Sequence, residues 1–479
     1  MKQMTPFLSC IFLLILSSCS NDFEEINTNP NDPVSVQPSL LLRQVIYDFG
    51  EQMSYEGFVA GDLLSQHRTA LDFNLFDRHA LKSPQLGGNP WPIFYTNLRD
   101  NEIILNRSQE SETFAVYEGP ALILKAYMSA GLTDLFGDVP YSEAFNGING
   151  TVTPAYDAQE DIYLAEGGIL DNLNKGIEAI ETYDDVIALE GDILFNGNLD
   201  NWVRFANSLK IKHLLRISDR IDVGAELQAI FNEGNYITDN SQNAVFNFSN
   251  TEPNSFRLAQ LRVGDFNNFV LSETMENILV DLDDARLSTF FRPATSTGEF
   301  DGLINGIDAT SSAAVLGDLS LAGTAFREDT SVLDANFMTA WETTFALAEA
   351  AQRGLITADA EGLYETGVAQ AFDYWQTDMP DGYLDGNASF NNPDSSPLEQ
   401  IITQKWIANI INGYEGWVEY RRTGFPEFMN VQASLNEGLI PVRMPYPSEE
   451  EALNADNYQT AFNATDGNSL NVRVWWDVE

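Results

Sequence analysis

The sequence predicts a mainly α protein, built from irregular tetratricopeptide-like helical hairpins that carry long binding loops and a few short strands. Apolar residues recur at the spacing of amphipathic helices in several segments of the chain. Between these segments lie long tracts without periodicity, which in a compact protein usually serve a function. A chain of 479 residues with 44% hydrophobic residues can bury a large core, and no long linker divides it.

Three helices are predicted in the first half of the chain. Residues 119–135 have an apolar face and place Pro120 in the first turn, where proline is favoured. Residues 157–180 carry apolar positions at helical spacing, and Asp157 is a suitable N-cap. Residues 201–217 repeat this pattern with aromatic and aliphatic side chains. Each of these segments should bury one face.

Further helices are predicted over residues 339–353, 361–375 and 397–412. The alanines between residues 346 and 351 would let two helices approach closely, as in helical-hairpin repeats. A repeat period of about 34 residues is not regular here, so we expect irregular hairpins rather than a uniform array.

Four tracts lack helical periodicity and are predicted to be loops on the helical scaffold. They span residues 66–90, 235–268, 292–334 and 377–397. Within and after them, residues 244–248 and 442–444 alternate in polarity like short strands. Loops of this length on a rigid scaffold usually carry the binding residues.

The N-terminal residues 1–18 are expected to be a lipoprotein signal peptide, since Lys2 precedes an apolar run of ten residues. The run ends in Leu-Ser-Ser before Cys19, which resembles a lipobox, so residues 19–479 would form a single domain lipidated at Cys19. The alternative is an ordinary secretory signal with a chance cysteine. Because Cys10 is the other cysteine of the chain, a processed and lipidated protein would have no free thiol.

The charge of the chain argues against nucleic acid as a partner. There are 71 acidic and 25 basic residues, and the formal net charge is −46. Binding a polyanion requires clustered lysine and arginine to displace counterions, and the sequence has no such stripe. A solvated acidic surface explains most of this charge without any partner.

Several phrases along the chain resemble the SusD/RagB family of nutrient-binding outer-membrane proteins, in particular its shorter members. The strongest phrase is Leu132 to Ala144 (LTDLFGDVPYSEA). The others follow in the order of the family: residues 27–33, 153–157, 202–218, 404–408, 413–426, 440–447, 454–458 and 475–477. The resemblance therefore spans nearly the whole chain.

The resemblance implies a lipid-anchored protein on the cell surface of the outer membrane. Such a protein would bind glycan oligomers or a polysaccharide and deliver them to a SusC-like TonB-dependent transporter, acting as a lid on that barrel. A peptide ligand for the same kind of transporter is an alternative. A purely structural lipoprotein or adhesin is another.

The sequence offers little chemistry for catalysis, so we expect no enzyme, no cofactor and no metal site. The chain has only His67, His79 and His213, and it lacks the motifs of nucleophilic, phosphoryl-transfer and dinucleotide sites. Residues 378–386 do not have the spacing of a calcium loop. A surface glycoside hydrolase stays open as an alternative, because it needs only two carboxylates at a suitable separation.

Candidate ligand-binding residues gather in two loops, over residues 66–91 and 251–269. A sugar site needs aromatic faces for stacking and polar side chains that pair with hydroxyl groups. The first loop offers Phe73, Phe76, Arg78, His79 and Trp91. The second loop offers Asn254, Phe256, Arg257, Phe266, Asn268 and Phe269. Each aromatic ring could instead belong to the core, and the two arginines could select an acidic or peptide ligand.

Two of the family phrases have a structural interpretation. Residues 133–141 read as the end of a helix that runs into Gly137 and then into the fixed backbone of Pro140. The Arg421-Arg422 pair reads as buried guanidinium groups that satisfy carbonyls at helix ends. The tryptophans in helical phrases, such as Trp202 and Trp406, are expected to be buried.

Overall fold

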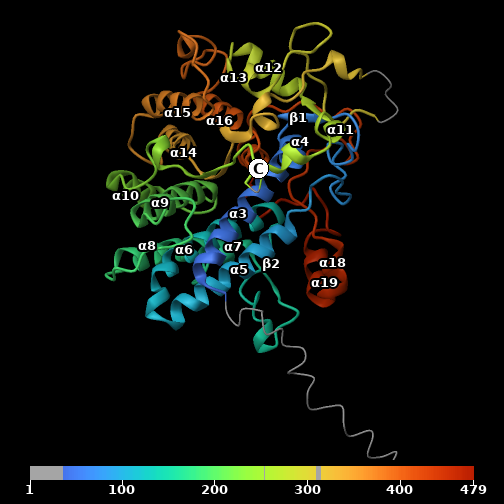
Figure 1. The fold of residues 1–479 in the computed structure, drawn as a ribbon. Helices are drawn as coiled ribbons and strands as arrows, with labels where there is room; N and C mark the ends of the chain where they lie inside the picture. The colour runs from blue at the N-terminus through green and yellow to red at the C-terminus, as the bar shows by residue number, and fades with distance from the viewer. Residues whose placement is uncertain (1–35, 253, 309–313, 479) are drawn as a thin grey trace, which may run out of the picture.

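A computed structural model describes residues 36–252, 254–308 and 314–478 of the chain (Figure 1). The expected signal peptide and Cys19 lie outside the described residues. The structure is mainly helical, which confirms the predicted fold class. Among the described helices, none has the length and apolar character needed to cross a membrane.

The first part of the chain forms a stack of long helices. These are α3 (Pro38–Glu56), α5 (Trp91–Glu110), α6 (Glu118–Phe136), α8 (Ile169–Glu181) and α9 (Leu199–Arg216). Each packs against the next, from α3 to α9 (Figure 1). Helices α6 and α8 meet at two glycines: a Cβ on Gly119 would lie 2.8 Å from the carbonyl oxygen of Gly176. Side chains at this crossing would force the helices apart.

The later helices form a second group. Helix α14 (Ala340–Gln352) packs against α15 (Ala360–Tyr374), α16 (Pro397–Ala408) and α9. Each begins at a polar cap, and Ser396 and Glu399 form a reciprocal capping box at the start of α16. The hairpin of α14 and α15 confirms the predicted helices over residues 339–353 and 361–375.

Shorter elements connect these helices. The short helices are α4 (Asp62–Leu64), α7 (Gln159–Leu164), α10 (Gly224–Glu233), α11 (Val263–Phe266), α12 (Glu273–Asp281), α13 (Arg286–Phe290), α17 (Glu415–Thr423), α18 (Ser448–Leu453) and α19 (Ala455–Ala464). A π-helical turn, η1 (Gly57–Gly61), continues α3. The 3-10 turns are η2 (Glu112–Tyr117), η3 (Gly147–Asn149), η4 (Asn240–Gln242), η5 (Arg257–Gln260), η6 (Leu316–Asp318), η7 (Thr324–Phe326), η8 (Thr330–Val332) and η9 (Tyr383–Asp385).

The strands of the described residues pair two by two, each pair antiparallel. Strand β1 (Arg68–Ala70) pairs with β5 (Phe269–Leu271), with Arg68 opposite Leu271. Strand β2 (Val139–Pro140) pairs with β3 (Tyr156–Asp157). Strand β4 (Ala244–Asn247) pairs with β6 (Asp334–Met338), which confirms the strand predicted over residues 244–248. These two-stranded ribbons hold loop segments against one another.

Three local predictions are wrong. Residues 157–180 do not form one helix, because the chain breaks at Gly167, whose φ of +76° is left-handed. Asp157 is not an N-cap: it lies in β3, and its carboxylate accepts hydrogen bonds from the amides of Tyr141 and Ser142. Residues 442–444 are not a strand, since their backbone makes single contacts with separate segments rather than a ladder.

The structural interpretation of the family phrases is confirmed in most respects. Helix α6 ends at Phe136, and Gly137 follows with a φ of +77°. The guanidinium of Arg421 donates to the carbonyl oxygens of Asp134, near the end of α6, and of Val442. Arg422 differs from the prediction: it pairs with the carboxylates of Glu349 and Glu419 rather than with carbonyls.

Candidate functional site

The two loops chosen from the sequence lie side by side. Strand β1 belongs to the first loop, and β5 follows directly on the second, so their pairing joins residues 66–91 to residues 251–269. The contact continues beyond the strands, where the amide of Leu71 donates to the carbonyl oxygen of Asn268 at 3.0 Å. Two loops that are far apart in the sequence are thus held together, as a ligand site built from residues of both loops would require.

Asp77 holds a third segment against this ribbon. Its buried carboxylate accepts from Thr69 Oγ1 at 2.8 Å and from the backbone amide of Ala70 at 3.2 Å. It also accepts from Asn305 Nδ2 and the amide of Gly306, both at 2.7 Å. Burial raises the pKa of Asp77 to about 6, and these four hydrogen bonds oppose that rise. Asp77 therefore serves the loop architecture rather than a ligand.

Most of the candidate rings lie in the core. Phe256 stacks on Phe248 at 4.8 Å, and Phe266 stacks on Phe58 at 5.3 Å. Five candidates are at most 8% exposed: Phe76, Trp91, Phe256, Phe266 and Phe269. A ring packed in this way offers no open face to a sugar, so in this structure these five rings stabilise the loops.

Several polar candidates also make internal contacts. Asn268 exchanges two hydrogen bonds with the backbone of Asp72. His79 is buried, and its Nδ1 lies 3.1 Å from the carbonyl oxygen of Leu439. Arg78 is half-buried, and its Nε donates to the carbonyl oxygen of Ala433 at 2.8 Å. Arg78 and His79 thereby hold the segment around residues 433–439 against the first loop.

Three candidates remain open to solvent: Phe73, Asn254 and Arg257. Phe73, in the first loop, is 49% exposed. The guanidinium of Arg257 lies 4.4 Å above the ring of Tyr55, and the hydroxyl of Tyr55 donates to the carbonyl oxygen of Leu86. Their roles as ligand contacts stay predictions, and they are the candidates that a ligand could reach.

A cleft that the sequence did not reveal lies beside the first loop. It has a volume of about 230 Å³, and residues 81–90 form one wall while residues 444–468, including parts of α18 and α19, form the other. Tyr458 and Phe462 supply rings to it, with centroids 5.8 Å apart. Lys82 and Asn89 are exposed along it and pair with no other described residue. The cleft thus combines rings with free polar groups.

A second hollow, of about 330 Å³, lies between α12, α16 and residues 387–395. Its lining is rich in amides and carboxylates, including Asn277, Asp281 and Asn392, and contains no aromatic ring. It could pair with hydroxyl groups but offers no face on which a pyranose ring would stack. The cleft beside the first loop is therefore the better match to a sugar.

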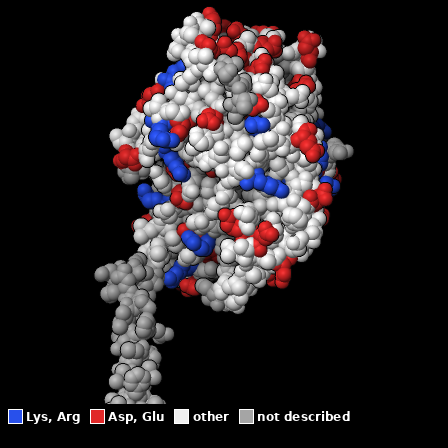
Figure 2. Space-filling model, turned by 90° about the vertical axis from the view of Figure 1, so that its right-hand side faces the viewer, with Lys and Arg blue, Asp and Glu red and all other residues white. Residues whose placement is uncertain are grey.

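The described residues contain no cluster of histidine, cysteine, aspartate and glutamate that could hold a metal ion. His67 lies within hydrogen-bonding distance of Ser65 and Asp62, but this trio is buried in the core, and the other ring nitrogen contacts the carbonyl oxygen of Trp406. It has the residue types of a catalytic triad without access for a substrate. On the face shown in Figure 2, lysine and arginine side chains are scattered among acidic ones.

Residues 30–447 match the family model SusD-like_2, which is described as "Starch-binding associating with outer membrane". The chain belongs to the SusD-like family. A SusD homologue from Bacteroides fragilis is 24% identical and superposes with a TM-score of 0.78, covering 93% of this chain and 100% of that one. A chitin-binding SusD homologue from Flavobacterium johnsoniae is 24% identical with a TM-score of 0.75, covering 92% and 98% of the two chains. No curated protein has a significantly similar sequence.

In this SusD-like chain, three of the recognised phrases converge on Asp134. Its carboxylate accepts hydrogen bonds from the hydroxyl of Tyr163 at 2.6 Å and from Trp476 Nε1 at 2.7 Å. Its carbonyl oxygen accepts from Arg421 at 2.6 Å. The phrases that reveal the SusD-like family therefore build the scaffold, which explains why they say little about the ligand.

Proposed function

We propose that the chain is a cell-surface lipoprotein that binds glycan oligomers and passes them to a SusC-like TonB-dependent transporter. The observation that carries this proposal is the match to the SusD-like family over residues 30–447. The similar solved protein from Flavobacterium johnsoniae is itself described as chitin-binding. Signal peptidase cleavage after residue 18 and acylation of Cys19 would anchor the protein in the outer membrane.

The cleft between residues 81–90 and 444–468 is the site that we assign to the glycan. The ring of Phe462 is half-buried, so part of it faces the cleft, as a sugar-stacking ring must. Lys82 can donate to hydroxyl groups, and Asn89 can both donate and accept. The net charge of −46 favours a neutral glycan over a sulfated or uronate polymer. Phe73 and Arg257 are candidate contacts for the outer part of an oligomer.

Binding without turnover is the activity that we propose. A glycoside hydrolase would cleave the oligomer that it binds, so a reducing-sugar assay on a bound glycan separates the two functions. Binding of peptides is the second alternative, in which Arg257 would pair with a carboxylate of the ligand. In the same titrations this function would appear as a preference for acidic peptides over glycans. A structural lipoprotein would show no saturable binding at all.

The test is isothermal titration of the mature protein with neutral glycan oligomers, chosen first from a glycan array. We expect saturable binding that Phe462→Ala weakens about tenfold, because a stacked ring contributes about 0.5–1.5 kcal/mol beyond its burial. Asn392→Ala, in the amide-lined hollow, is the matched control and should bind normally. If Phe462→Ala binds normally and Phe73→Ala or Arg257→Ala loses binding, the site lies at the exposed residues of the two loops instead.

The partnership with a transporter has its own test. Purification of the lipoprotein from native membranes in mild detergent, with cells grown on the bound glycan, should recover a TonB-dependent barrel. A stable interface should bury more than about 1,000 Å² of surface, so the pair should survive size-exclusion chromatography. Recovery of the lipoprotein alone under these conditions would refute the role as a lid. Cys19→Ala should release the protein from the membrane fraction.

A further inference from the structure

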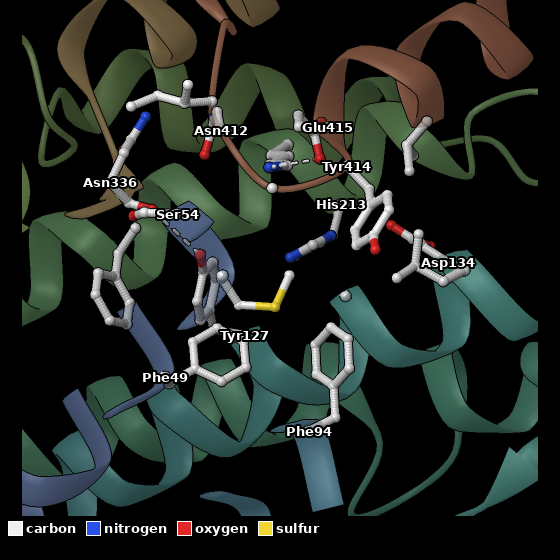
Figure 3. Close-up of a pocket in the computed structure, with 18 residues that line it drawn as sticks. Phe49, Ser54, Phe94, Tyr127, Asp134, His213, Asn336, Asn412, Tyr414 and Glu415 are labelled. Atoms are coloured by element: carbon white, nitrogen blue, oxygen red, sulfur yellow. Dashed lines mark hydrogen bonds and ion pairs between the residues drawn. The ribbon is translucent and has the colours of Figure 1, made fainter. Parts of the chain in front are cut away.

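A chamber of about 80 Å³ lies at the junction between the helical stack and the loop-rich part of the chain. Helices α3, α5, α6 and α9 form one side, and β6 and the turn at residues 411–415 form the other (Figure 3). The turn is held close to η1, since a Cβ on Gly61 would lie 1.8 Å from the carbonyl oxygen of Gly413. Asn336 and Asn412 are half-buried at the rim of the chamber.

The imidazole of His213 projects into this chamber (Figure 3). The residue is 3% exposed, and neither Nδ1 nor Nε2 has a hydrogen-bond partner among the described residues. Asn336 also lines the chamber, and its buried Oδ1 lacks a described partner. A buried polar atom without a partner costs about 1–3 kcal/mol, so three such atoms at one cavity require an explanation.

The ring of His213 is neutral. Burial, together with the positive charges of Lys212 and Arg216, lowers its pKa well below the ordinary value. A neutral imidazole has one nitrogen that donates and one that accepts a hydrogen bond. Its missing partners must therefore include both an acceptor and a donor.

The charged groups around the chamber already form ion pairs with one another, although Nε and Nη1 of Arg216 make no described hydrogen bond. Lys212 Nζ lies 2.7 Å from Glu342 and 3.1 Å from Glu415. Arg216 lies 2.6 Å from Glu415 and 3.3 Å from Glu419. Because these ion pairs are formed within the chain, the chamber has no unpaired charge that would recruit an anion or a cation.

The size of the chamber limits its occupant. A cavity of about 150 Å³ accommodates benzene, so a space of about 80 Å³ is too small to enclose a sugar ring or an aromatic ligand. A water molecule occupies about 30 Å³ of the liquid. The chamber has room for two or three water molecules.

Other buried polar groups in the protein show that a missing hydrogen-bond partner does not by itself indicate a bound guest molecule. Two nitrogens of the Arg68 guanidinium also lack partners, but the guanidinium lies 4.3 Å from the ring centroid of Phe58 and 4.4 Å from that of Phe326. Aromatic faces attract that cation and leave no space for a guest. His213 differs because open volume adjoins the ring.

We infer that this chamber is an internal hydration site, in which ordered water molecules hydrogen-bond to both ring nitrogens of His213 and to Oδ1 of Asn336. Water suits this site because each molecule both donates and accepts, whichever nitrogen of the ring carries the proton. Such water would bridge α9 and β6 across the junction by hydrogen bonds and would be a structural component of the fold.

A high-resolution crystal structure of the mature protein tests this inference directly. We expect isolated density peaks at about 2.7–3.2 Å from Nδ1 and Nε2 of His213. Water-relaxation measurements in solution should count the same long-lived molecules. An empty chamber, or density of a multi-atom additive beside His213, would refute the proposal.

A pair of histidine variants extends the test. His213→Leu should lose the peaks that contact the ring and lower the count of long-lived water molecules. His79→Asn changes a buried histidine away from the chamber and is the matched control. This variant should keep both the density peaks beside His213 and the count of long-lived water molecules. An unchanged count in a folded His213→Leu protein would contradict the assignment. If that variant does not fold, the density around the wild-type ring decides alone.

Discussion

Asn268 and Asp72 join the two loops through a reciprocal pair of hydrogen bonds. Oδ1 of Asn268 accepts from the backbone amide of Asp72 at 2.6 Å, and its Nδ2 donates to the carbonyl oxygen of Asp72 at 2.5 Å. The pair extends the β1–β5 ribbon by one step, with a side chain taking the place of a backbone partner. A residue that the sequence suggested for ligand contact thus fixes the geometry of the loops.

Replacing Asn268 by alanine should destabilise the protein without removing a surface group. The change breaks both hydrogen bonds and leaves backbone groups of Asp72 without partners, so the free energy of unfolding in urea should fall by about 1–3 kcal/mol. Asn254→Ala, in the same loop but exposed, should change it by less than about 0.5 kcal/mol. Equal effects of the two changes would show that the pair does not hold the loops.

The rings of the second loop should behave as core residues. Phe266→Ala removes the partner of Phe58, and we expect a loss of about 3–5 kcal/mol in the free energy of unfolding. Phe73→Ala, at an exposed ring, should leave stability within about 0.5 kcal/mol of the wild type. Thermal and urea denaturation of both variants would check this contrast. A stable Phe266→Ala protein would show that the loop packs differently in solution.

The sequence predicted the helices better than the loops, for a physical reason. A helix such as α8 buries one face at a fixed spacing, so its apolar positions are visible in the sequence. The burial of Trp202 and Trp406 was predicted on the same basis and is confirmed. In a loop no such period exists, and Phe73 and Phe256 look alike although one is exposed and the other is buried.

The cleft and the chamber could not be predicted from the sequence. Each is formed by segments that are distant along the chain, such as residues 81–90 and 444–468. His213 lies in a helix where the sequence gives no sign of a cavity, since the opposite wall comes from β6 and residues 411–415. Only the tertiary arrangement of these segments creates the space.

The stability of the loops should depend on pH through His79. Burial lowers its pKa to about 4, although the hydrogen bond to the carbonyl oxygen of Leu439 opposes this shift. Below about pH 6.5 the unfolded chain binds a proton that the folded His79 does not, so the free energy of unfolding decreases between pH 6.5 and 4. The loss should reach about 2 kcal/mol at pH 5.

His79→Asn provides the matched variant for this pH dependence. The Nδ2 of asparagine takes the position of the histidine Nδ1 and can donate to Leu439, and asparagine tolerates the left-handed φ of +65° at this position. Urea denaturation between pH 7.5 and 5 should show a shallower decline for the variant than for the wild type. Parallel declines would exclude His79 as the titrating group.

The buried carboxylate of Glu419 should be the most sensitive acidic position of the scaffold. It lies 2.9 Å from Lys405, 2.8 Å from Arg422 and 3.3 Å from Arg216. Burial would raise the pKa of Glu419, but these three cations together hold it well below its ordinary value. The ionised carboxylate therefore favours the folded state at neutral pH, and this contribution is lost when the pH falls through the lowered pKa.

Glu419→Gln keeps the shape of the side chain but leaves the three buried cations with one fewer counter-charge. Breaking a buried ion pair from one side costs about 3–5 kcal/mol, because the remaining charge stays desolvated without compensation. We expect a loss of that size in the free energy of unfolding at pH 7, measured in urea. Glu233→Gln, at an exposed carboxylate without a described ion pair, should change it by less than about 0.5 kcal/mol. If both variants are equally stable, Glu349 and Glu415 compensate for the missing charge and the cations do not depend on Glu419.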